Sequence, residues 1–203
     1  MKIDDILAQI QAVPLRNGRR IIAIAGAPAS GKSTLSDVLA RRIPNAYVIP
    51  MDGFHRDNVD LEKHGLLARK GAPETFDVTG FIQIIQAVRV EKTMSFPTFD
   101  RTNDCVVPTG GQLPASAETI IVEGNYLLLN VAPWNELAKE WDLSLMVDVP
   151  LPVLQERLVA RWLQHGHDAE SALARAQSND IPNAQTVIDK SAPADLMIDG
   201  TLV

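Results

Sequence analysis

Short apolar runs recur along the chain, separated by segments long enough to hold helices. The runs occupy residues 21–25, 46–50, 119–122, 143–149 and 196–198. Runs that are apolar throughout, instead of alternating with polar residues, are typical of strands buried on both faces. The pattern therefore predicts an α/β fold, with a parallel sheet covered by helices on both of its faces.

Between these runs, apolar residues return every three or four positions, which is the spacing of an amphipathic helix. Helices are predicted at residues 3–13, 32–42, 79–90, 134–140, 151–164, 169–177 and 183–190. We expect the first of these to be a lead-in helix without a catalytic role. Residues 52–76 and 95–114 are rich in glycine, proline and charge, and we expect them to form loops around a site.

The length and composition fit one domain. The chain has 203 residues, of which 46% are hydrophobic, and this is enough to bury a sizeable core. We expect a single domain over residues 1–203, with the lead-in helix in 1–18, acceptor-site insertions in 53–118 and a lid at about 155–178.

Charge and cysteine content exclude some classes of protein. The net charge of −6 and the lack of a basic stretch argue against nucleic-acid binding. The single cysteine, Cys105, cannot form an internal disulfide, and residues 1–14 do not form a signal sequence. No apolar run approaches the length of about 20 residues needed to cross a bilayer. We therefore expect a reducing, cytoplasmic setting without membrane insertion.

The strongest functional signal is a phosphate-binding loop of the pattern GxxxxGK[ST]. It lies between the apolar run 21–25 and the helix 32–42, the strand–loop–helix order that this motif requires. The glycines let successive N–H groups point at phosphate oxygens, and Lys32 can reach the β- and γ-phosphates. Ser33 would place its hydroxyl on Mg²⁺, whereas Thr34 caps or packs the start of the helix. The predicted nucleotide-binding residues are Gly26, Ala27, Pro28, Ala29, Ser30, Gly31, Lys32, Ser33 and Thr34.

Two acidic residues follow predicted strands and should emerge at the same edge of the sheet as this loop. Asp52 follows the second apolar run and is the candidate general base. Glu123 follows the third run and would lie near the metal ion. Asp52 could instead form a turn with Gly53, and Glu123 could also have only a structural role in a turn.

Three further segments support a family resemblance when taken with the phosphate loop. They are residues 51–55 (MDGFH), 69–77 (RKGAPETFD) and 120–124 (IIVEG). In this order the chain resembles the uridine kinase, phosphoribulokinase and bacterial pantothenate kinase group of P-loop kinases. The first two segments are most similar to a small branch of that group whose members are named fructose transport system kinases.

The resemblance implies a five-stranded parallel sheet of order 2-3-1-4-5, within a three-layer αβα sandwich, and a helical lid after the fourth strand. It also implies that Lys32 and Ser33 contact phosphate and Mg²⁺, that Asp52 is the base and that Glu123 lies near the metal. Arg157 and Arg161 fall where the lid of that group carries arginines. They are four residues apart and share one helix face, so Arg161 could balance charge on the transferred phosphoryl group, unless the pair is simply a solvated face beside Glu156.

Two departures from the group bear on the acceptor. Residues 165–168 read His-Gly-His-Asp where uridine kinases have a more basic lid, which makes the charge of the lid dependent on pH. Residues 99–101 replace the Tyr-Asp pair of the uridine kinase acceptor loop, and no histidine follows before Pro114. A pyrimidine nucleoside is therefore disfavoured as the acceptor.

A set of polar residues is predicted to surround the acceptor, although each of them could also be a solvated loop residue. Carboxylates accept hydrogen bonds from hydroxyl groups and arginine pairs with phosphate, so the mixture suits a sugar or a sugar phosphate. The predicted acceptor-binding residues are Asp52, His55, Arg69, Lys70, Asp77, Asp100 and Arg101.

The sequence thus predicts an ATP- and Mg²⁺-dependent kinase that transfers the γ-phosphate to a hydroxyl of a small metabolite, with a sugar such as fructose favoured. In this prediction Asp52, Lys32 and Arg161 are the catalytic residues. Pantothenate and a nucleoside remain alternative acceptors. A different class of protein, a nucleotide-binding regulator of a sugar transport system with little catalysis, also fits. Whether the chain forms a homodimer is left open.

Overall fold

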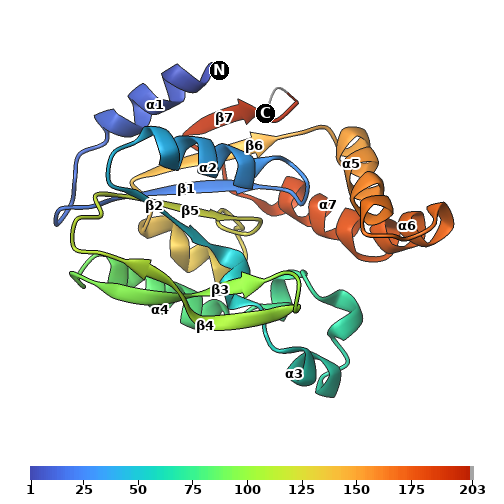
Figure 1. Ribbon diagram of the computed structural model, residues 1–203. Helices are drawn as coiled ribbons and strands as arrows, with labels where there is room; N and C mark the ends of the chain where they lie inside the picture. The colour runs from blue at the N-terminus through green and yellow to red at the C-terminus, as the bar shows by residue number, and fades with distance from the viewer. Residues whose placement is uncertain (202–203) are drawn as a thin grey trace.

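A five-stranded parallel sheet forms the centre of the computed structural model, which describes residues 1–201. Its strands lie in the order β2-β5-β1-β6-β7 (Figure 1). Their bounds are β1 (Arg20–Gly26), β2 (Ala46–Pro50), β5 (Thr119–Gly124), β6 (Leu143–Asp148) and β7 (Leu196–Asp199). Counted along the chain, these five strands have the order 2-3-1-4-5, so the predicted topology is confirmed.

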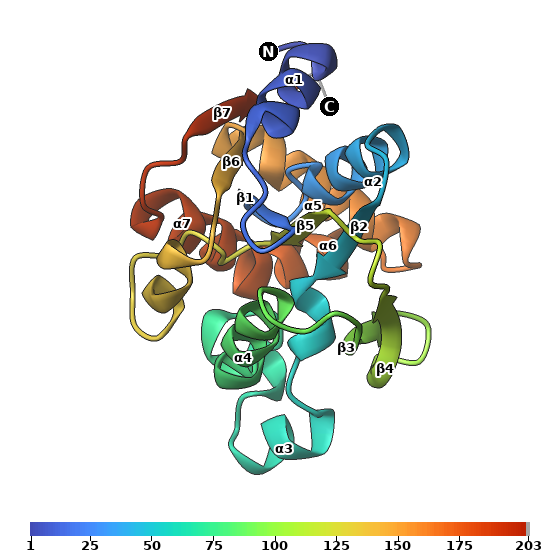
Figure 2. The same ribbon diagram turned by 90° about the vertical axis from the view of Figure 1, so that its left-hand side faces the viewer.

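Helices cover both faces of the sheet, as the buried strands require. Alternate residues of β1 point to opposite faces, so that Ile21 joins one hydrophobic core and Ile22 the other. The core of Ile22 is covered by α1 (Ile3–Ala12) and α2 (Lys32–Arg42). The core of Ile21 is covered by α4 (Val78–Val88), the 3-10 helix η4 (Trp134–Lys139) and α7 (Ile181–Lys190). Figure 2 shows this three-layer αβα sandwich in a view from the side.

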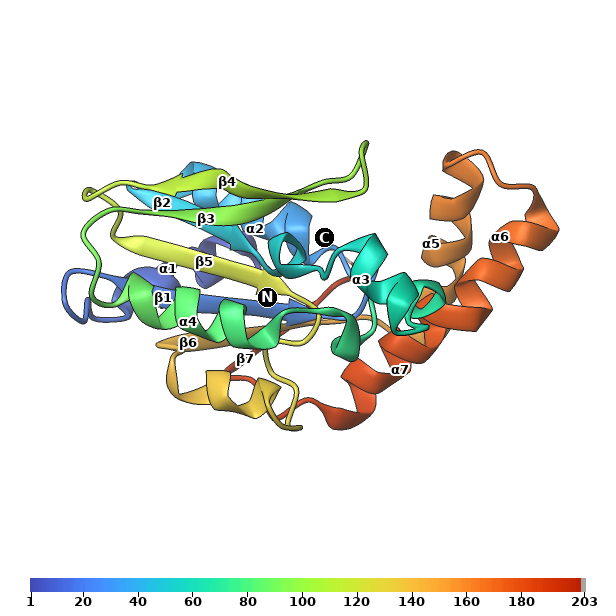
Figure 3. The ribbon, with the colours of Figure 1, turned by 90° about the horizontal axis from the view of Figure 1, so that it is seen from below.

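A helical arm extends beyond the carboxyl edge of the sheet. We use this name for α5 (Leu151–Gln164), α6 (Ala169–Arg175) and the π-helical turn η5 (Ala176–Asp180), which leads into α7. The arm follows β6, the fourth strand of the sheet, which is the place expected for the lid. Figure 3 shows α5 and α6 on one side of the carboxyl edge and α3 (Asn58–Lys63) nearer to the sheet.

The prediction that residues 95–114 form a loop is wrong, because most of them form an antiparallel β-hairpin. Its strands are β3 (Met94–Asp100) and β4 (Cys105–Leu113). Pro97 lies at a shift in the register, where a missing N–H does not interrupt the ladder. A Cβ at Gly111 would collide with the ring of Phe96 across the hairpin, so this glycine is required for close packing.

Residues 52–76 are also more ordered than the predicted loop. They contain α3 and the 3-10 turns η1 (Met51–Phe54), η2 (Leu67–Arg69) and η3 (Pro73–Thr75). Each of these elements spans six residues or fewer, which is too short to display a helical period in the sequence.

The amino edge of the sheet is held together by buried charged side chains. Arg19 is 5% exposed, and its guanidinium donates to the carbonyl oxygens of five residues: Val88, Glu91, Lys92, Pro114 and Ala117. Asp142 accepts from the backbone N–H of Ile21 at 2.7 Å and pairs with Arg89 at 2.7 Å. Side-chain hydrogen bonds and ion pairs therefore stabilise the amino edge of the sheet, whereas loops and the helical arm surround its carboxyl edge.

None of the helices formed by residues 1–201 combines the length and the apolar character that crossing a membrane requires.

Candidate active site

The phosphate loop joins β1 to α2 at the carboxyl edge of the sheet. Gly31 precedes the first residue of α2 with a φ of 96°, and Ala29 has a φ of 63°. A residue in the left-handed region turns the chain sharply, and only glycine adopts it without strain. These turns curl residues 26–31 ahead of the N-terminus of α2, where backbone N–H groups favour an anion.

Ser33 and Glu123 form a polar pair beside this loop. The Ser33 hydroxyl donates to Glu123 Oε2 at 3.0 Å, and Glu123 is only 7% exposed. Burial raises the pKa of Glu123, against the opposing effect of the nearby Lys32 ammonium. Burial lowers the pKa of Lys32, and the carboxylates of Glu123 and Asp52 oppose that shift. The three groups are thus electrostatically coupled.

The donor set of Ser33 and Glu123 fits Mg²⁺. This ion is usually held by one or two carboxylates together with substrate phosphates and water, so a hydroxyl and one carboxylate beside a phosphate loop are sufficient. In the part of the chain that the structure describes, no group of three or more His, Cys, Asp and Glu side chains is arranged to hold a metal ion.

Asp52 is the second residue of η1, which directly follows β2. Its Oδ2 accepts from Arg101 Nη2 at 2.6 Å, with the Asp52 side chain 25% exposed and the Arg101 side chain 73% exposed. A Cβ at Gly53 would collide with the carbonyl of Pro97 on β3. Gly53 therefore lets the hairpin pack directly against η1, and this packing brings Arg101 to Asp52.

A cavity of about 990 Å³ opens in front of Asp52, between η1, the hairpin and the helical arm. Phosphate-loop residue Pro28 also borders it. Its polar and charged lining consists of Asp52, His55, Asn58, Lys70, Arg101, Asp104, Asn125, Arg161, His165, Arg175, Asn179, Asp180 and Asn183. A volume of this size is in the range of sites for small molecules.

One wall of the cavity combines aromatic rings with an ion pair. The ring of His55 stacks on Phe76, with centroids 4.2 Å apart, and lies 4.9 Å from the ring of Phe99. Lys70 Nζ sits 4.9 Å from the centroid of Phe99 and pairs with Asp104 Oδ1 at 2.8 Å. Burial lowers the pKa of His55 to about 4, so this imidazole is neutral at neutral pH.

Comparisons with known proteins identify relatives, although no family model matches the chain. The uncharacterized protein YggC of Escherichia coli strain K12 is 37% identical over 203 residues, which cover 97% of this chain and 84% of YggC. A protein of Schizosaccharomyces pombe, provisionally named uridine kinase C227.14, is 31% identical over 194 residues, which cover 89% of this chain and 83% of that protein.

A solved structure extends the similarity to the whole fold. The crystal structure of a provisionally named fructose transport system kinase from Silicibacter sp. TM1040 matches with a TM-score of 0.93 and 42% identity, covering 97% of this chain and 98% of that one. The chain belongs to the group of P-loop kinases that includes uridine kinase and pantothenate kinase.

In this P-loop kinase, the two arginines of α5 face different parts of the site. The guanidinium of Arg157 donates to the carbonyls of Ala29 at 3.3 Å and Gly200 at 3.0 Å, so it lies against the phosphate loop. Arg161, one turn later, borders the cavity and pairs with Asp180 at 3.2 Å. The sequence predicted that both belong to one face, and the structure places both towards the site.

Other residues predicted for the acceptor pocket of the kinase lie outside the cavity wall. Asp77 caps α4 by accepting from the N–H of Gly80 at 3.0 Å. Asp100 accepts from the N–H groups of Thr102 and Asn103 and so shapes the tip of the hairpin. Arg69 points to the helical arm. Thr34, which was predicted to bind the nucleotide, is exposed in the first turn of α2.

Several residues at the cavity were missed by sequence reasoning. Asn125 could have been predicted, because it follows Glu123 by two residues at the end of a strand. In the structure it borders the cavity, and its Oδ1 is buried without a partner among residues 1–201. Asp104 and Asp180 carried no local signal. They belong to the site because Lys70 and Arg161 pair with them in the folded chain.

Proposed function

We propose that this P-loop kinase transfers the γ-phosphate of ATP, with Mg²⁺, to a hydroxyl group of a small metabolite. The main support for the proposal is that three features of the site lie close together. The phosphate loop, the Ser33–Glu123 pair and the Asp52 carboxylate meet at one edge of the sheet, in front of a polar cavity of about 990 Å³. Fold alone does not imply a reaction, but this arrangement contains the parts that phosphoryl transfer needs.

The nucleotide side of the reaction depends on the phosphate loop. Its backbone N–H groups and Lys32 would bind the β- and γ-phosphates, and Ser33 and Glu123 would hold Mg²⁺. The metal would supply charge neutralisation between these phosphates. Arg157 lies against the loop, and Arg161 borders the cavity, so the helical arm would act as a lid that adds positive charge near the transferred group.

The acceptor side depends on Asp52. As the acceptor oxygen forms its bond to the γ-phosphorus, the bond from that phosphorus to the β,γ-bridging oxygen breaks and ADP leaves. The Asp52 carboxylate takes the proton of the attacking hydroxyl. Its ion pair with Arg101 is exposed and open to exchange, so a substrate hydroxyl can compete for Oδ2.

A sugar is the favoured acceptor class. The cavity offers carboxylates and amides that suit several hydroxyl groups, including Asp52, Asp104 and Asn125. The neutral ring of His55 can accept or donate one hydrogen bond, and its aromatic neighbours suit the apolar face of a sugar ring. The name of the Silicibacter relative points to the same class of acceptor.

The deciding experiment measures ADP release with ATP and Mg²⁺ against a panel of sugars, sugar phosphates, pantothenate, nucleosides and glycerate. Asp52→Asn serves as the blank. Asp57→Asn, an exposed aspartate whose side chain makes no cap hydrogen bond, serves as the matched control. Stimulation by one acceptor that is lost only in Asp52→Asn would support the proposal and identify the acceptor. ATP binding without stimulation by any acceptor would favour the regulator of a sugar transport system.

A further inference from the structure

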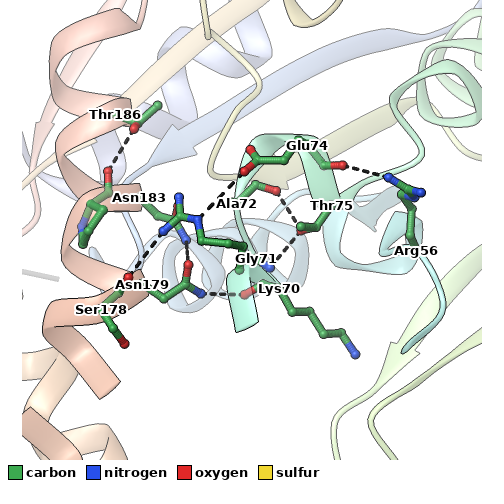
Figure 4. Close-up of polar contacts among 12 residues, drawn as sticks. Arg56, Lys70, Gly71, Ala72, Glu74, Thr75, Ser178, Asn179, Asn183 and Thr186 are labelled. Carbon is green, nitrogen blue, oxygen red and sulfur yellow. Dashed lines mark hydrogen bonds and ion pairs between the residues drawn. The ribbon is translucent and has the colours of Figure 1, made fainter. Parts of the chain in front are cut away.

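The π-helical turn η5, the last part of the helical arm, lies between the acceptor cavity and α5, and its residues bond to both. On the acceptor side, the amide of Asn179 donates to the backbone carbonyl of Lys70 at 2.7 Å. Arg69 adds longer contacts, to the carbonyl of Ser178 at 3.4 Å and to Asn183 Oδ1 at 3.5 Å. Figure 4 shows Asn179, Asn183 and Ser178 facing the segment that carries Lys70.

The next residue of η5 bonds to α5. Asp180 is only 9% exposed, and its carboxylate accepts from Trp162 Nε1 at 2.6 Å and from Arg161 Nη2 at 3.2 Å. Two consecutive residues, Asn179 and Asp180, therefore connect the backbone of the acceptor wall to the arginine of the arm. Single π-helical turns occur frequently at functional sites.

The turn that follows Lys70 in the acceptor wall is held by hydrogen bonds. The N–H of Gly71 donates to Thr75 Oγ1 at 2.9 Å, and the Thr75 hydroxyl donates to the carbonyl of Ala72 at 2.7 Å (Figure 4). The hydroxyl of Tyr126 donates to the carbonyl of Gly71 at 2.6 Å. These bonds connect the turn after Lys70 to Thr75 and Tyr126.

The side chain of Lys70 links this segment to the cavity, where a ligand could contact it. Its Nζ donates to Asn58 Oδ1 at 2.7 Å and to Asp104 Oδ1 at 2.8 Å, and it borders the cavity beside Phe99. A ligand that engages Lys70 therefore acts on the residue whose carbonyl is held by Asn179. The bonds form one continuous path from the cavity through Lys70, Asn179 and Asp180 to Arg161.

We propose that Asn179 is a positioning residue that couples the Lys70 wall of the acceptor cavity to Arg161 of the helical arm. Binding at either end would then favour the bound arrangement of the other end. This inference rests on the proposed function, because it treats the cavity as the acceptor site and the arm as the lid over the nucleotide. Asn179 touches neither reacting group in this assignment and acts through Lys70.

Hydrogen–deuterium exchange with and without Mg²⁺ and the ATP analogue AMP-PNP tests this coupling, and it needs no identified acceptor. In the wild-type protein we expect the analogue to slow exchange by about fivefold or more in two segments, residues 155–178 and residues 66–76. In Asn179→Asp, which keeps the shape of the side chain but removes its N–H donor, residues 155–178 should stay protected. The slowing in residues 66–76 should fall below about twofold.

Two further variants separate coupling from loss of structure. Asn179→Ala removes the donor without adding a charge and should behave as Asn179→Asp does. Gln185→Ala makes the same amide-to-alanine change on α7, where the Gln185 amide donates to Asp189 at 2.7 Å, and should behave as the wild type does. A purely structural role for Asn179 would instead speed exchange in both segments before the analogue is added.

Protection of residues 66–76 that persists in both Asn179 variants would overturn the inference, and so would its absence in the wild type. The proposed function has a separate test, because failure of every acceptor to stimulate ADP release would leave the exchange pattern unchanged.

Discussion

The phosphate loop and the acceptor cavity share one edge of the sheet, but they are built in different ways. The phosphate loop consists of nine consecutive residues, and its chemistry comes mainly from the backbone and the start of α2. The cavity is assembled from side chains of distant segments, joined in ion pairs such as Asp52 with Arg101 and Lys70 with Asp104. The contrast teaches that the proposed nucleotide site depends on local sequence, whereas the proposed acceptor site depends on how hairpin, arm and sheet are packed together.

The largest expected effect comes from removing the lysine of the phosphate loop. Lys32→Ala should lower kcat/KM for acceptor-dependent ADP release by about a thousandfold, because a preorganised charge on the transferred phosphoryl group is lost. Lys63→Ala, at an exposed lysine of α3, is the matched control and should retain activity. Steady-state kinetics with the best acceptor of the panel measures both variants. Activity of Lys32→Ala within about tenfold of the wild type would contradict the role assigned to this residue.

The next largest effect comes from a change at Asp52, which should affect the acceptor reaction and not nucleotide binding. Asp52→Asn should lower kcat by about a hundredfold, since the amide cannot take the proton of the hydroxyl. Affinity for Mg²⁺ and AMP-PNP, measured by calorimetry, should change by less than about threefold, because Asp52 is assigned no contact to the nucleotide. A variant that keeps acceptor-dependent turnover within about tenfold of the wild type would exclude Asp52 as the base.

The same contrast explains how much of the molecule could be predicted from the sequence. The five central strands are continuous apolar runs between helical segments, so their existence and order followed from the pattern together with the family resemblance. The hairpin did not follow, because Pro97, Pro108 and the glycine pair of β4 suppress the signal of a strand. Those residues are tolerated in a two-stranded element whose outer edges are unpaired.

Within the site, residues at the ends of central strands were predictable and residues fixed by tertiary packing were not. Asp52 follows β2, and Glu123 lies near the end of β5. The sequence could therefore predict that both residues lie at the same edge of the sheet. Arg69 was predicted for the acceptor pocket but points to the carbonyl of Ser178, on a turn more than a hundred positions later. The partner of an arginine cannot be read from its own neighbourhood, since several carbonyls and carboxylates compete for it.

A smaller effect probes the neutral histidine of the cavity wall. The pKa of His55 is about 4 in the folded protein, against an ordinary value of 6.5, so the unfolded chain binds this proton first as the pH falls. The resulting stabilisation is present above pH 6.5 and decreases towards pH 4. Relative to pH 7.5, this group should cost about 2.5 kcal/mol at pH 4.5, which is about seventyfold in the unfolding equilibrium.

His55→Gln should remove this contribution, so that its free energy of unfolding falls less between the two pH values than that of the wild type. Urea denaturation at both pH values measures the difference. His167→Gln changes an exposed histidine of the arm and should keep the pH dependence of the wild type. Equal pH dependence in His55→Gln and the wild type would show that His55 is not held neutral.

The smallest expected effect tests whether Arg101, which pairs with Asp52, contributes to acceptor binding more than to stability. Arg101→Met should raise KM for the acceptor by about tenfold, because one charged contact is lost from the hairpin side. It should leave the free energy of unfolding within about 0.5 kcal/mol of the wild type, since exposed ion pairs contribute little to stability. Kinetics and urea denaturation test the two parts. Arg41→Met, at an exposed arginine of α2, is the control, and an unchanged KM in Arg101→Met would remove Arg101 from the acceptor site.

The buried Arg19 has a consequence for how this kinase could diversify. Two of the carbonyls that it holds belong to Lys92, just before β3, and to Pro114, just after β4. One guanidinium on the amino edge thus closes the base of the hairpin, while the tip of the hairpin reaches Asp52 at the opposite edge. The base of the hairpin is therefore held to the core, whereas its tip borders the cavity. Substitutions and changes of length near its tip can remodel the acceptor site while the junction with the sheet stays the same.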